Sequence, residues 1–273
     1  MLSGGLSPQS FRRLSALVRE RSGIALSDDK RMLVANRLRK HVTELGYEAY
    51  DPYSDYVLTS GAAAEIDTLI ELLVTNHTSF FREPEHFRLL SEEVLPELAS
   101  SSGPVRLWSA AASSGEEVYT MAMVVAEASR QIRGLDCRIT GSDISRRMLA
   151  IADKGVYPLA ALDPVGPVFT KRYFQRGISS QNGRCRAQAD LRSRVRFRRI
   201  NLLDSSYPVG GRQHVIFCRN VMIYFDAEVR AQTIDRLTDM LVPGGYLFVG
   251  YSESLGAHTP GLEPAWHGVY RRI

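Results

Sequence analysis

The residues best suited to chemistry lie between a predicted strand and a predicted helix, in the segment from Val105 to Tyr119. Small side chains at positions 109 to 115 let a ligand approach the backbone, and the helix that follows begins with unpaired N–H groups. The segment therefore predicts a nucleotide-type cofactor site. It is not a G-x-G-x-x-G turn, because Gly115 is its only glycine, and Glu116 and Glu117 would repel a pyrophosphate. The alternative is that the small residues only permit tight packing between strand and helix.

Acids at such a turn suit a cationic ligand. S-adenosylmethionine (SAM) has no phosphate and carries a positively charged amino group and a sulfonium, so nearby carboxylates favour its binding. Asp143 ends the next predicted strand, where an acidic residue hydrogen-bonds ribose hydroxyls in doubly wound folds. An isolated Asp143 would more often cap a helix. Together with the first turn, it favours the cofactor interpretation.

Two later segments place polar side chains directly after predicted strands. Asn201 follows the third strand, and Asn220 and Tyr224 follow the fourth. Ligands of open α/β sheets bind at the carboxyl ends of the strands, and an asparagine offers both a donor and an acceptor to a ligand. The alternatives are that Asn201 only forms a turn and that Tyr224 is only an aromatic residue at the start of a helix.

A polar segment with two phenylalanines, Thr75 to Glu83, precedes these strands. Asn76, Thr78 and Arg82 lie in it and predict a lid over the cofactor, with an interdomain linker as the alternative. The six histidines show no metal-ligand spacing, so we expect no metal. No Ser-His-Asp or Cys-His arrangement predicts nucleophilic catalysis either.

The first hundred residues predict an all-α unit. Ser7 before Pro8 is typical of a helix start. A second helix should begin at Ser27 and stop at Gly46. Further helices are expected from Tyr50 to Leu58 and from Ala63 to Val74. The apolar stripe expected on the second helix consists of Met32, Leu33, Leu38 and Val42, and the same stretch is crowded with basic residues, Arg31, Arg37, Arg39 and Lys40.

From about residue 104 onward, short apolar runs alternate with helical segments, which predicts parallel strands with crossover helices. One stretch breaks this alternation. Between Gly155 and Arg194, Asn182-Gly183 is a strong hairpin signal, so we expect an inserted antiparallel subdomain with a basic face. Residues 242 to 245 predict a turn after the last helix. The expected strands are Val105 to Ala110, Arg138 to Asp143, Val195 to Ile200, Val215 to Cys218, Tyr246 to Tyr251 and Gly268 to Arg272, and the expected helices are Glu116 to Gln131, Ser145 to Lys154 and Ala227 to Leu241.

Composition places the 273-residue chain among ordinary globular proteins. It is 44% hydrophobic and 23% charged, with a formal net charge of +4, which excludes wholesale disorder. The three cysteines lie far apart and predict a reducing compartment. No apolar run has the length of a signal peptide or a membrane span, so we expect a soluble, cytoplasmic protein. Residues 170 to 200 carry ten basic residues and one acid, which predicts a basic patch.

With these residues in view, the chain resembles the CheR family of chemotaxis receptor glutamate methyltransferases. The blocks that carry the resemblance are Lys30 to Leu38, Thr75 to Glu83, Trp108 to Glu117, Ser142-Asp143, Asn201 to Leu203, Ile216 to Phe225 and Pro243 to Glu253. The resemblance implies cofactor contacts by Asn76, Thr78, Arg82, Glu116, Asp143, Asn201, Leu202, Arg219 and Asn220. It places Tyr224 beside the methyl-transfer site, and we expect Arg82 and Tyr224 to orient the reacting groups as catalytic residues.

The resemblance also implies an architecture. An all-α N-terminal domain (residues 1–74) and a linker or lid (75–103) precede a class I methyltransferase domain (104–273). That domain is a doubly wound α/β sheet with a small antiparallel β-subdomain inserted at about residues 160–194. Two positions depart from the family pattern: Gln213-His214 replaces an aromatic-Asp pair, and Tyr251 replaces a histidine.

The implied reaction transfers a methyl group from SAM to glutamate carboxylates in the cytoplasmic signalling domains of chemoreceptors. The products are γ-glutamyl methyl esters, which serve sensory adaptation, and S-adenosylhomocysteine (SAH). Arg31, Arg37, Arg39 and Lys40 resemble the surface that faces the receptor, and in some family members the β-subdomain docks the receptor's C-terminal tail by strand addition. We expect a monomer that neither binds nucleic acid nor inserts into membranes.

Two rival functions follow from other features. An arginine-rich stretch from Arg192 to Arg199 would suit a nucleic-acid amino-methyltransferase, but the loop from Asn220 to Tyr224 lacks the two prolines typical of such enzymes. A non-catalytic, SAM-sensing receptor adaptor is the other rival. The presence of Arg82, Asp143 and Tyr224 argues against the adaptor, because a lapsed enzyme has no reason to keep them.

Overall fold

The computed structural model describes residues 4–59, 63–100, 103–256 and 259–273, which form two compact units. The helical unit contains the helices between Pro8 and Leu73, together with Asn201–Leu203 and Tyr224–Ala231. The sheet unit contains most of the remainder, from Asn76 onward. In the described residues, no helix is both long and apolar enough to span a bilayer.

The helical unit begins as predicted. The Ser7 side chain accepts a hydrogen bond from the Ser10 N–H at 3.1 Å, and Gly23 ends the first helix in the left-handed conformation, φ 76°. Phe11, Leu14 and Val18 from this helix are buried in the unit's core. The helices are α1 (Pro8–Ser22), α2 (Arg31–Glu44), α3 (Tyr50–Thr59) and α4 (Ala63–Leu73), with a 3-10 turn, η1 (Asp28–Lys30), before α2.

The predicted apolar stripe of α2 is half wrong. Leu38 and Val42 are buried as expected, but Met32 is 64% exposed and Leu33 is 43% exposed. The buried stripe instead runs through Val34, Ala35, Leu38 and Val42. Positions three and four apart share a helix face, and residues 32 and 33 lie outside the face that this set defines.

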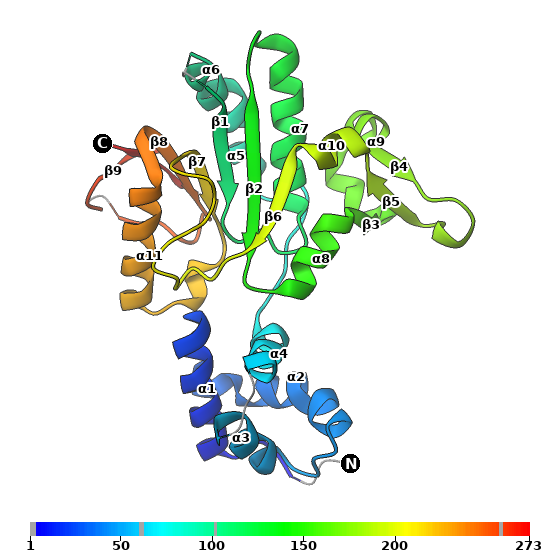
Figure 1. Cartoon of the computed structure of the whole chain (residues 1–273), viewed down its shortest axis with the longest axis vertical. Helices are drawn as coiled ribbons and strands as arrows, with labels where there is room; N and C mark the ends of the chain where they lie inside the picture. The colour runs from blue at the N-terminus through cyan, green and yellow to red at the C-terminus, as the bar shows by residue number, and fades with distance from the viewer. Residues whose placement is uncertain (1–3, 60–62, 101–102, 257–258) are drawn as a thin grey trace. The chain divides into compact units, whose positions relative to one another are not determined.

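The sheet unit is built on a seven-stranded mixed sheet in the order β6-β2-β1-β7-β8-β10-β9 (Figure 1). The first five strands in this order pair in parallel, and β10 is antiparallel to both β8 and β9. This confirms a class I methyltransferase sheet, in which the parallel strands end at one edge. The strands are β1 (Val105–Ser109), β2 (Cys137–Asp143), β6 (Val195–Arg199), β7 (Gln213–Cys218), β8 (Leu241–Val249), β9 (Leu262–Trp266) and β10 (Val269–Arg272).

Two strand predictions need correction. Strand β9 was not predicted. Strand β8 starts at Leu241, so residues 242 to 245 lie inside it rather than in a separate turn. The pairing explains the turn-like sequence: Gln213 pairs with Leu241 and Val215 already pairs with Tyr246, so the intervening residues bulge out of register. Gly244 has φ 76°, a conformation that glycine adopts without strain.

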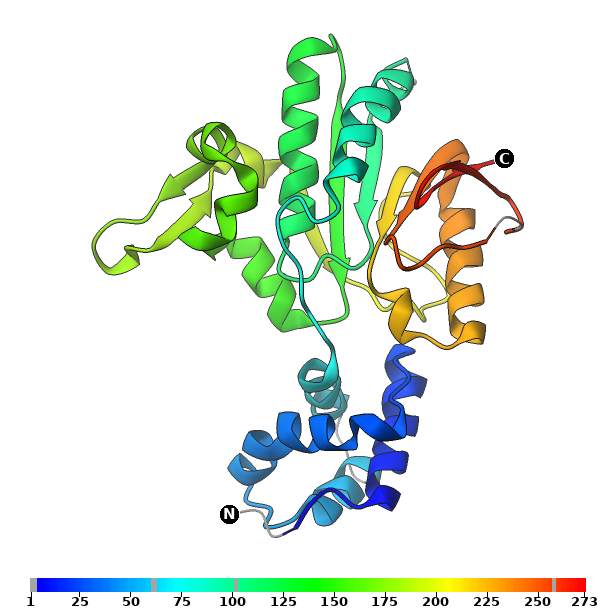
Figure 2. The same ribbon diagram turned by 180° about the vertical axis from the view of Figure 1, so that it is seen from behind.

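Helix α7 (Glu116–Gln131) crosses the sheet from β1 to β2, as predicted. It packs against β2 and against the helical stretch before β1, which is α5 (Pro84–Leu89), the π-turn η2 (Leu90–Val94) and α6 (Leu95–Leu98) (Figure 2). Phe217 of β7 is stacked on Phe248 with ring centroids 4.3 Å apart, and on Phe87 at 5.6 Å. The other helices are α8 (Arg146–Lys154) and α11 (Ala227–Met240).

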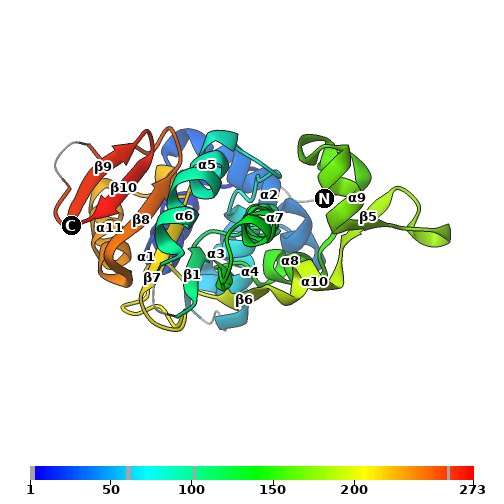
Figure 3. The ribbon, with the colours of Figure 1, turned by 90° about the horizontal axis from the view of Figure 1, so that it is seen from above.

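The expected antiparallel insertion is present as a three-stranded sheet in the order β3-β5-β4. Figure 3 shows it at the opposite end of the sheet unit from β9 and β10. Asn182-Gly183 lies in the β4–β5 connection, where Gly183 has φ 80°. The elements are β3 (Val156–Pro158), η3 (Leu159–Val165), α9 (Pro167–Tyr173), β4 (Phe174–Arg176), η4 (Ser179–Gln181), β5 (Arg184–Ala187) and α10 (Ala189–Ser193).

Candidate active site

The sequence-predicted site residues are divided between the two units. Tyr224 and the pair Asn201-Leu202 belong to the helical unit. The others are in the sheet unit and come from the segment before α5, the turn after β1 and the ends of β2 and β7: Asn76, Thr78, Arg82, Glu116, Asp143, Arg219 and Asn220.

The turn after β1 is held by Asp143. Its Oδ2 accepts a hydrogen bond from the Ser113 N–H at 2.8 Å, and its Oδ1 accepts one from the Ser145 N–H at 2.9 Å. Ser113 has φ 47°, a conformation in which a non-glycine residue is strained. The side chain that caps α8 is that of Ser145, which accepts from the Met148 N–H. Asp143 is therefore not the helix cap that the alternative interpretation proposed.

Gly115 at the start of α7 is required by packing. Its φ is 96°, and a Cβ at this position would lie 2.8 Å from the Ala152 Cβ. The small residues after β1 thus permit close packing, as the alternative interpretation expected. They also leave a turn with a buried carboxylate beside it, Asp143, which is 8% exposed.

Glu116 is a buried acid with little compensation. It is 9% exposed, and the Ser114 hydroxyl donates to its Oε2 at 2.7 Å. Burial raises the pKa of Glu116 above its ordinary value. In the described part of the chain, no lysine or arginine forms an ion pair with Glu116, and a buried carboxylate of this kind is suited to a ligand that brings positive charge.

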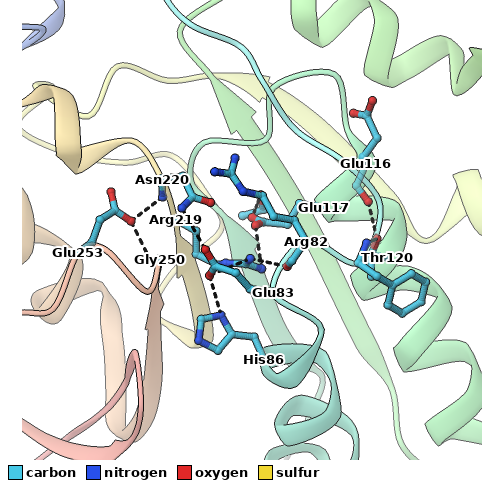
Figure 4. A network of polar contacts seen from close by, with 12 residues as sticks. Arg82, Glu83, His86, Glu116, Glu117, Thr120, Arg219, Asn220, Gly250 and Glu253 are labelled. Carbon is cyan, nitrogen blue, oxygen red and sulfur yellow. Dashed lines mark hydrogen bonds and ion pairs between the residues drawn. The ribbon is translucent and has the colours of Figure 1, made fainter. Parts of the chain in front are cut away.

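Arg219, directly after β7, is the centre of a polar network (Figure 4). Its side chain is 1% exposed; Nη2 donates to the Arg82 carbonyl oxygen at 2.5 Å and to Glu83 Oε2 at 3.1 Å. Nη1 lies 3.4 Å from Glu117 Oε2. The guanidinium also lies over two rings, with its Cζ 5.4 Å from the centroid of Phe87 and 5.7 Å from that of Phe217. These contacts hold Arg219 between α5, α7 and β7.

Asn220 is held beside Arg219 by two acids. Its N–H donates to Glu253 Oε2 at 2.5 Å, and its Nδ2 donates to Glu83 Oε1 at 3.1 Å. Sequence reasoning did not assign roles to Glu83, Glu117 or Glu253. The available signal was their position, because all three lie inside blocks that carry the family resemblance.

The segment before α5 is anchored in the sheet unit. Phe80 is buried, with its ring centroid 5.1 Å from that of Tyr157 and 5.5 Å from that of Phe174. Arg82 remains partly exposed, and its Nη1 donates to the His77 carbonyl oxygen at 3.0 Å. Ser113 Oγ donates to the Asn76 carbonyl oxygen at 2.9 Å, which ties this segment to the turn after β1.

The site residues of the helical unit are held by its own backbone. Asn201 Nδ2 donates to the Arg21 carbonyl oxygen at 2.6 Å, and Asn201 Oδ1 accepts from the Leu203 N–H at 3.1 Å. The second contact is the turn-forming role that was the alternative interpretation of Asn201. The carbonyl of Tyr224 accepts from the Ala25 N–H at 2.8 Å, and its side chain packs against the helical core.

The four basic residues of α2 are not equivalent. Arg37 Nη1 donates to the Leu73 carbonyl oxygen at 2.5 Å and to that of Val74 at 3.2 Å. It thereby satisfies carbonyl groups at the end of α4, where a helix lacks intrahelical donors. Arg39 and Lys40 are exposed, and Arg31 is partly exposed.

The two departures from the family pattern are accommodated. Gln213 is buried and its Nε2 donates to the Val209 and Gly211 carbonyl oxygens, while His214 Nδ1 accepts from the Arg106 N–H at 3.1 Å. The Tyr251 ring packs against His86, with centroids 4.8 Å apart. Neither departure leaves one of these side chains without contacts.

Glu116→Gln should stabilise the protein at neutral pH. The pKa of Glu116 is higher in the folded chain than in the unfolded chain. The stability that this difference contributes is therefore fully present below the pKa of the unfolded chain, and it is lost as the pH rises through the pKa of the folded chain. The glutamine variant has no such loss. Urea unfolding should therefore show the stability of E116Q increasing relative to wild type as the pH rises above the ordinary glutamate pKa of about 4.3.

Glu85→Gln is the matched control for this pH series. Arg88 holds the pKa of the exposed Glu85 below its ordinary value. The free energy of unfolding of this variant should therefore fall relative to wild type as the pH rises. A Glu116→Gln variant that follows the trend of the control would contradict the interpretation of Glu116 as an uncompensated buried acid.

Comparison with known proteins identifies the family. Residues 9–74 match the family "CheR methyltransferase, all-alpha domain", and residues 76–266 match "CheR methyltransferase, SAM binding domain". The chain is 39% identical to a "Chemotaxis protein methyltransferase" from Salmonella typhimurium, covering 91% of this chain and 85% of that one, and equally similar to the Escherichia coli protein of the same name over the same shares. It is 38% identical to "Chemotaxis protein methyltransferase 2" from Pseudomonas aeruginosa, covering 90% of this chain and 86% of that one.

Proposed function

The chain belongs to the CheR methyltransferase family, and on this premise we propose that it methylates glutamate side chains of chemoreceptors. The donor is SAM, the acceptor is a carboxylate in the receptor's cytoplasmic signalling domain, and the products are a γ-glutamyl methyl ester and SAH. We infer from this acceptor that the protein acts in the cytoplasm.

The observation that carries this proposal is a set of five carboxylates from the segment before α5, the start of α7, the end of β2 and the loop after β8. Arg219 pairs with Glu83 and Glu117, and the Arg82 charge also lowers the pKa of Glu117. SAM, with its ammonium and sulfonium charges, fits such a donor set, whereas a pyrophosphate would be repelled. The carboxylates concerned are Glu83, Glu116, Glu117, Asp143 and Glu253.

We assign SAM binding to the residues that the family resemblance implies. They are Asn76, Thr78, Arg82, Glu116, Asp143, Asn201, Leu202, Arg219 and Asn220. When bound, SAM supplies an electrophilic methyl carbon on a sulfonium, which makes the C–S bond the one that breaks.

The chain's own residues then have to orient the reacting groups. A receptor glutamate with a pKa of about 4.3 is already ionised at neutral pH, so no side chain has to remove a proton from it. Alignment of its oxygen with the methyl carbon at about 3 to 3.5 Å contributes roughly 7 to 11 kcal/mol to lowering the barrier. We assign this orientation to Arg82 and Tyr224.

Transfer of labelled methyl from SAM to a chemoreceptor signalling domain tests the proposal. Base-labile label on receptor glutamates supports it, and the label should disappear when the acceptor glutamates are replaced by alanine. Tight binding of SAH without any labelling of receptor would instead support the non-catalytic adaptor.

The small antiparallel sheet gives a second receptor contact within this proposal. Its edge strands are β3 and β4, because β5 is paired on both sides. A receptor tail that binds by strand addition would pair with one of these edges. Arg176 on β4 and Arg184 and Arg186 on β5 would favour an acidic tail.

Charge reversal on α2 should separate receptor recognition from cofactor binding. The triple variant Arg31→Glu, Arg39→Glu, Lys40→Glu should lower receptor methylation at low salt by about tenfold or more, because complementary charge speeds encounter. Its Kd for SAH, measured by calorimetry, should stay at the wild-type value.

Arg37→Glu is a separate variant and should behave differently. Arg37 donates to the carbonyl groups of Leu73 and Val74, so Arg37→Glu should lower the thermal midpoint as well as activity.

If the triple variant lost SAH affinity in parallel with receptor methylation, the assignment of α2 to receptor recognition would be wrong.

A further inference from the structure

Asn220 is fixed at both its backbone and its side chain. It adopts a left-handed conformation, φ 57°, which is uncommon for a residue other than glycine. Its N–H donates to Glu253 and its side-chain Nδ2 donates to Glu83. These two carboxylates come from opposite ends of the sheet unit's sequence, before α5 and after β8 (Figure 4).

Glu253 is a buried carboxylate that accepts hydrogen bonds from backbone N–H groups. It is 1% exposed, and besides Asn220 it accepts hydrogen bonds from the N–H groups of Gly250 at 2.8 Å and Ile223 at 3.2 Å. Charge-assisted bonds of this kind are stronger than neutral ones. They join the loop after β8 to the loop after β7, which contains Asn220.

Gly250 shows how closely these loops approach. A Cβ at this position would lie 2.5 Å from Asn220 Nδ2 and 2.7 Å from Glu253 Oε2. Any side chain here would have to displace one of the two groups. The position of the Asn220 amide is therefore set by tight packing as well as by hydrogen bonds.

Glu83 determines which way the Asn220 amide faces. Its Oε1 accepts from Asn220 Nδ2, while its Oε2 accepts from Arg219 Nη2 at 3.1 Å. Because a carboxylate can only accept, the nitrogen end of the Asn220 amide must turn toward Glu83. Among the described residues, no hydrogen bond reaches Asn220 Oδ1.

We propose that Glu83 and Glu253 are positioning residues that hold Asn220 with its amide nitrogen toward the protein and its Oδ1 available to a hydrogen-bond donor of the cofactor. The inference rests on the proposed function, because it takes Asn220 as a cofactor contact. Glu83 and Glu253 act through Asn220 and touch no reacting atom themselves. Glutamine at position 83 could no longer accept from both Asn220 and Arg219, since one of its two ends is a donor.

A double-mutant cycle on SAH binding tests the proposal. SAH lacks the sulfonium charge, so calorimetry with it reports hydrogen bonding more than long-range attraction. Glu83→Gln and Asn220→Ala should each raise the Kd by about tenfold, and the double variant should raise it by about tenfold to twentyfold, because both remove the same contact. If the two substitutions acted independently, their effects would multiply and the double variant would raise the Kd by about a hundredfold.

Two controls accompany the cycle. Glu85→Gln removes an equal charge two residues away on an exposed side chain that pairs with Arg88, and it should leave the Kd within about twofold of wild type. Leu237→Ala in α11 removes a fully buried side chain outside the network, so it should lower the thermal midpoint without changing the Kd at a temperature where it is folded. Glu253→Gln should raise the Kd as Glu83→Gln does.

The outcomes distinguish a failure of the proposed function from a failure of the positioning role. Wild-type protein that binds neither SAM nor SAH would overturn the proposed function. If wild type binds SAH but Glu83→Gln matches Glu85→Gln, or if the cycle is multiplicative, the positioning role is wrong. A Kd that rises in Leu237→Ala as much as in Glu83→Gln would also overturn it, because affinity would then only follow stability.

Discussion

Arg219→Met should lower the free energy of unfolding by about 3 to 5 kcal/mol, because it removes the cation from a buried ion-pair network and leaves the acids unpaired. The Arg219 guanidinium is 1% exposed and lies between Glu83 and Glu117. Methionine fills similar volume between Phe87 and Phe217 but cannot donate to either acid. Urea unfolding at neutral pH measures this loss directly.

The pH dependence adds a second check on Arg219. Burial already raises the pKa of Glu117, and Arg219 opposes that rise. Without Arg219 the pKa should rise further, so the variant should recover part of its stability as the pH falls and Glu117 takes up a proton. Arg88→Met, at an exposed pair, is the matched control and should lower the urea midpoint only slightly, because exposed ion pairs contribute little. A small, pH-independent loss in Arg219→Met would contradict the charge-network interpretation.

Arg82→Ala should lower kcat for receptor methylation by about a hundredfold or more, because misplacing a reacting group by about 1 Å has an effect of this size. The contact that links Arg82 to the buried network is its backbone carbonyl, which accepts from Arg219 and which alanine retains. Its side chain donates to the His77 carbonyl oxygen, which is its one hydrogen bond with the described residues. We therefore expect the thermal midpoint to change little while activity is lost.

Arg82→Lys distinguishes orientation from charge. Lysine keeps the positive charge but lacks the planar fork of donors, so it should recover only a small part of the activity. Steady-state kinetics should show the loss mainly in kcat. A loss confined to KM for SAM would mean that Arg82 only binds the cofactor, and full recovery by lysine would mean that its charge alone is needed.

Local pattern predicted most of the secondary structure. Helix α7 has the predicted bounds, and the Ser7 cap and the hairpin around Asn182-Gly183 are where short-range rules placed them. The errors occurred where one sequence pattern is compatible with two local structures. Met32 and Leu33 are apolar residues close to a buried stripe but on the wrong side of the helix, and residues 242 to 245 form a bulge inside a strand because β7 continues to pair beside them.

The sequence by itself determined the elements, their order, the family and the acidic character of the turn after β1, because these depend on neighbours within a few residues or on whole motifs. Only the tertiary structure decided which acids meet Arg219 and Asn220. Glu83 and Arg219 are 136 residues apart, and Asn220 and Glu253 are 33 apart. Glu253 reaches Asn220 because β7 and β8 are neighbours in the sheet, and Glu83 reaches Arg219 because α5 packs on β7 through Phe87 and Phe217. Hydrophobic periodicity predicts which face of a strand is buried but not which element packs beside it.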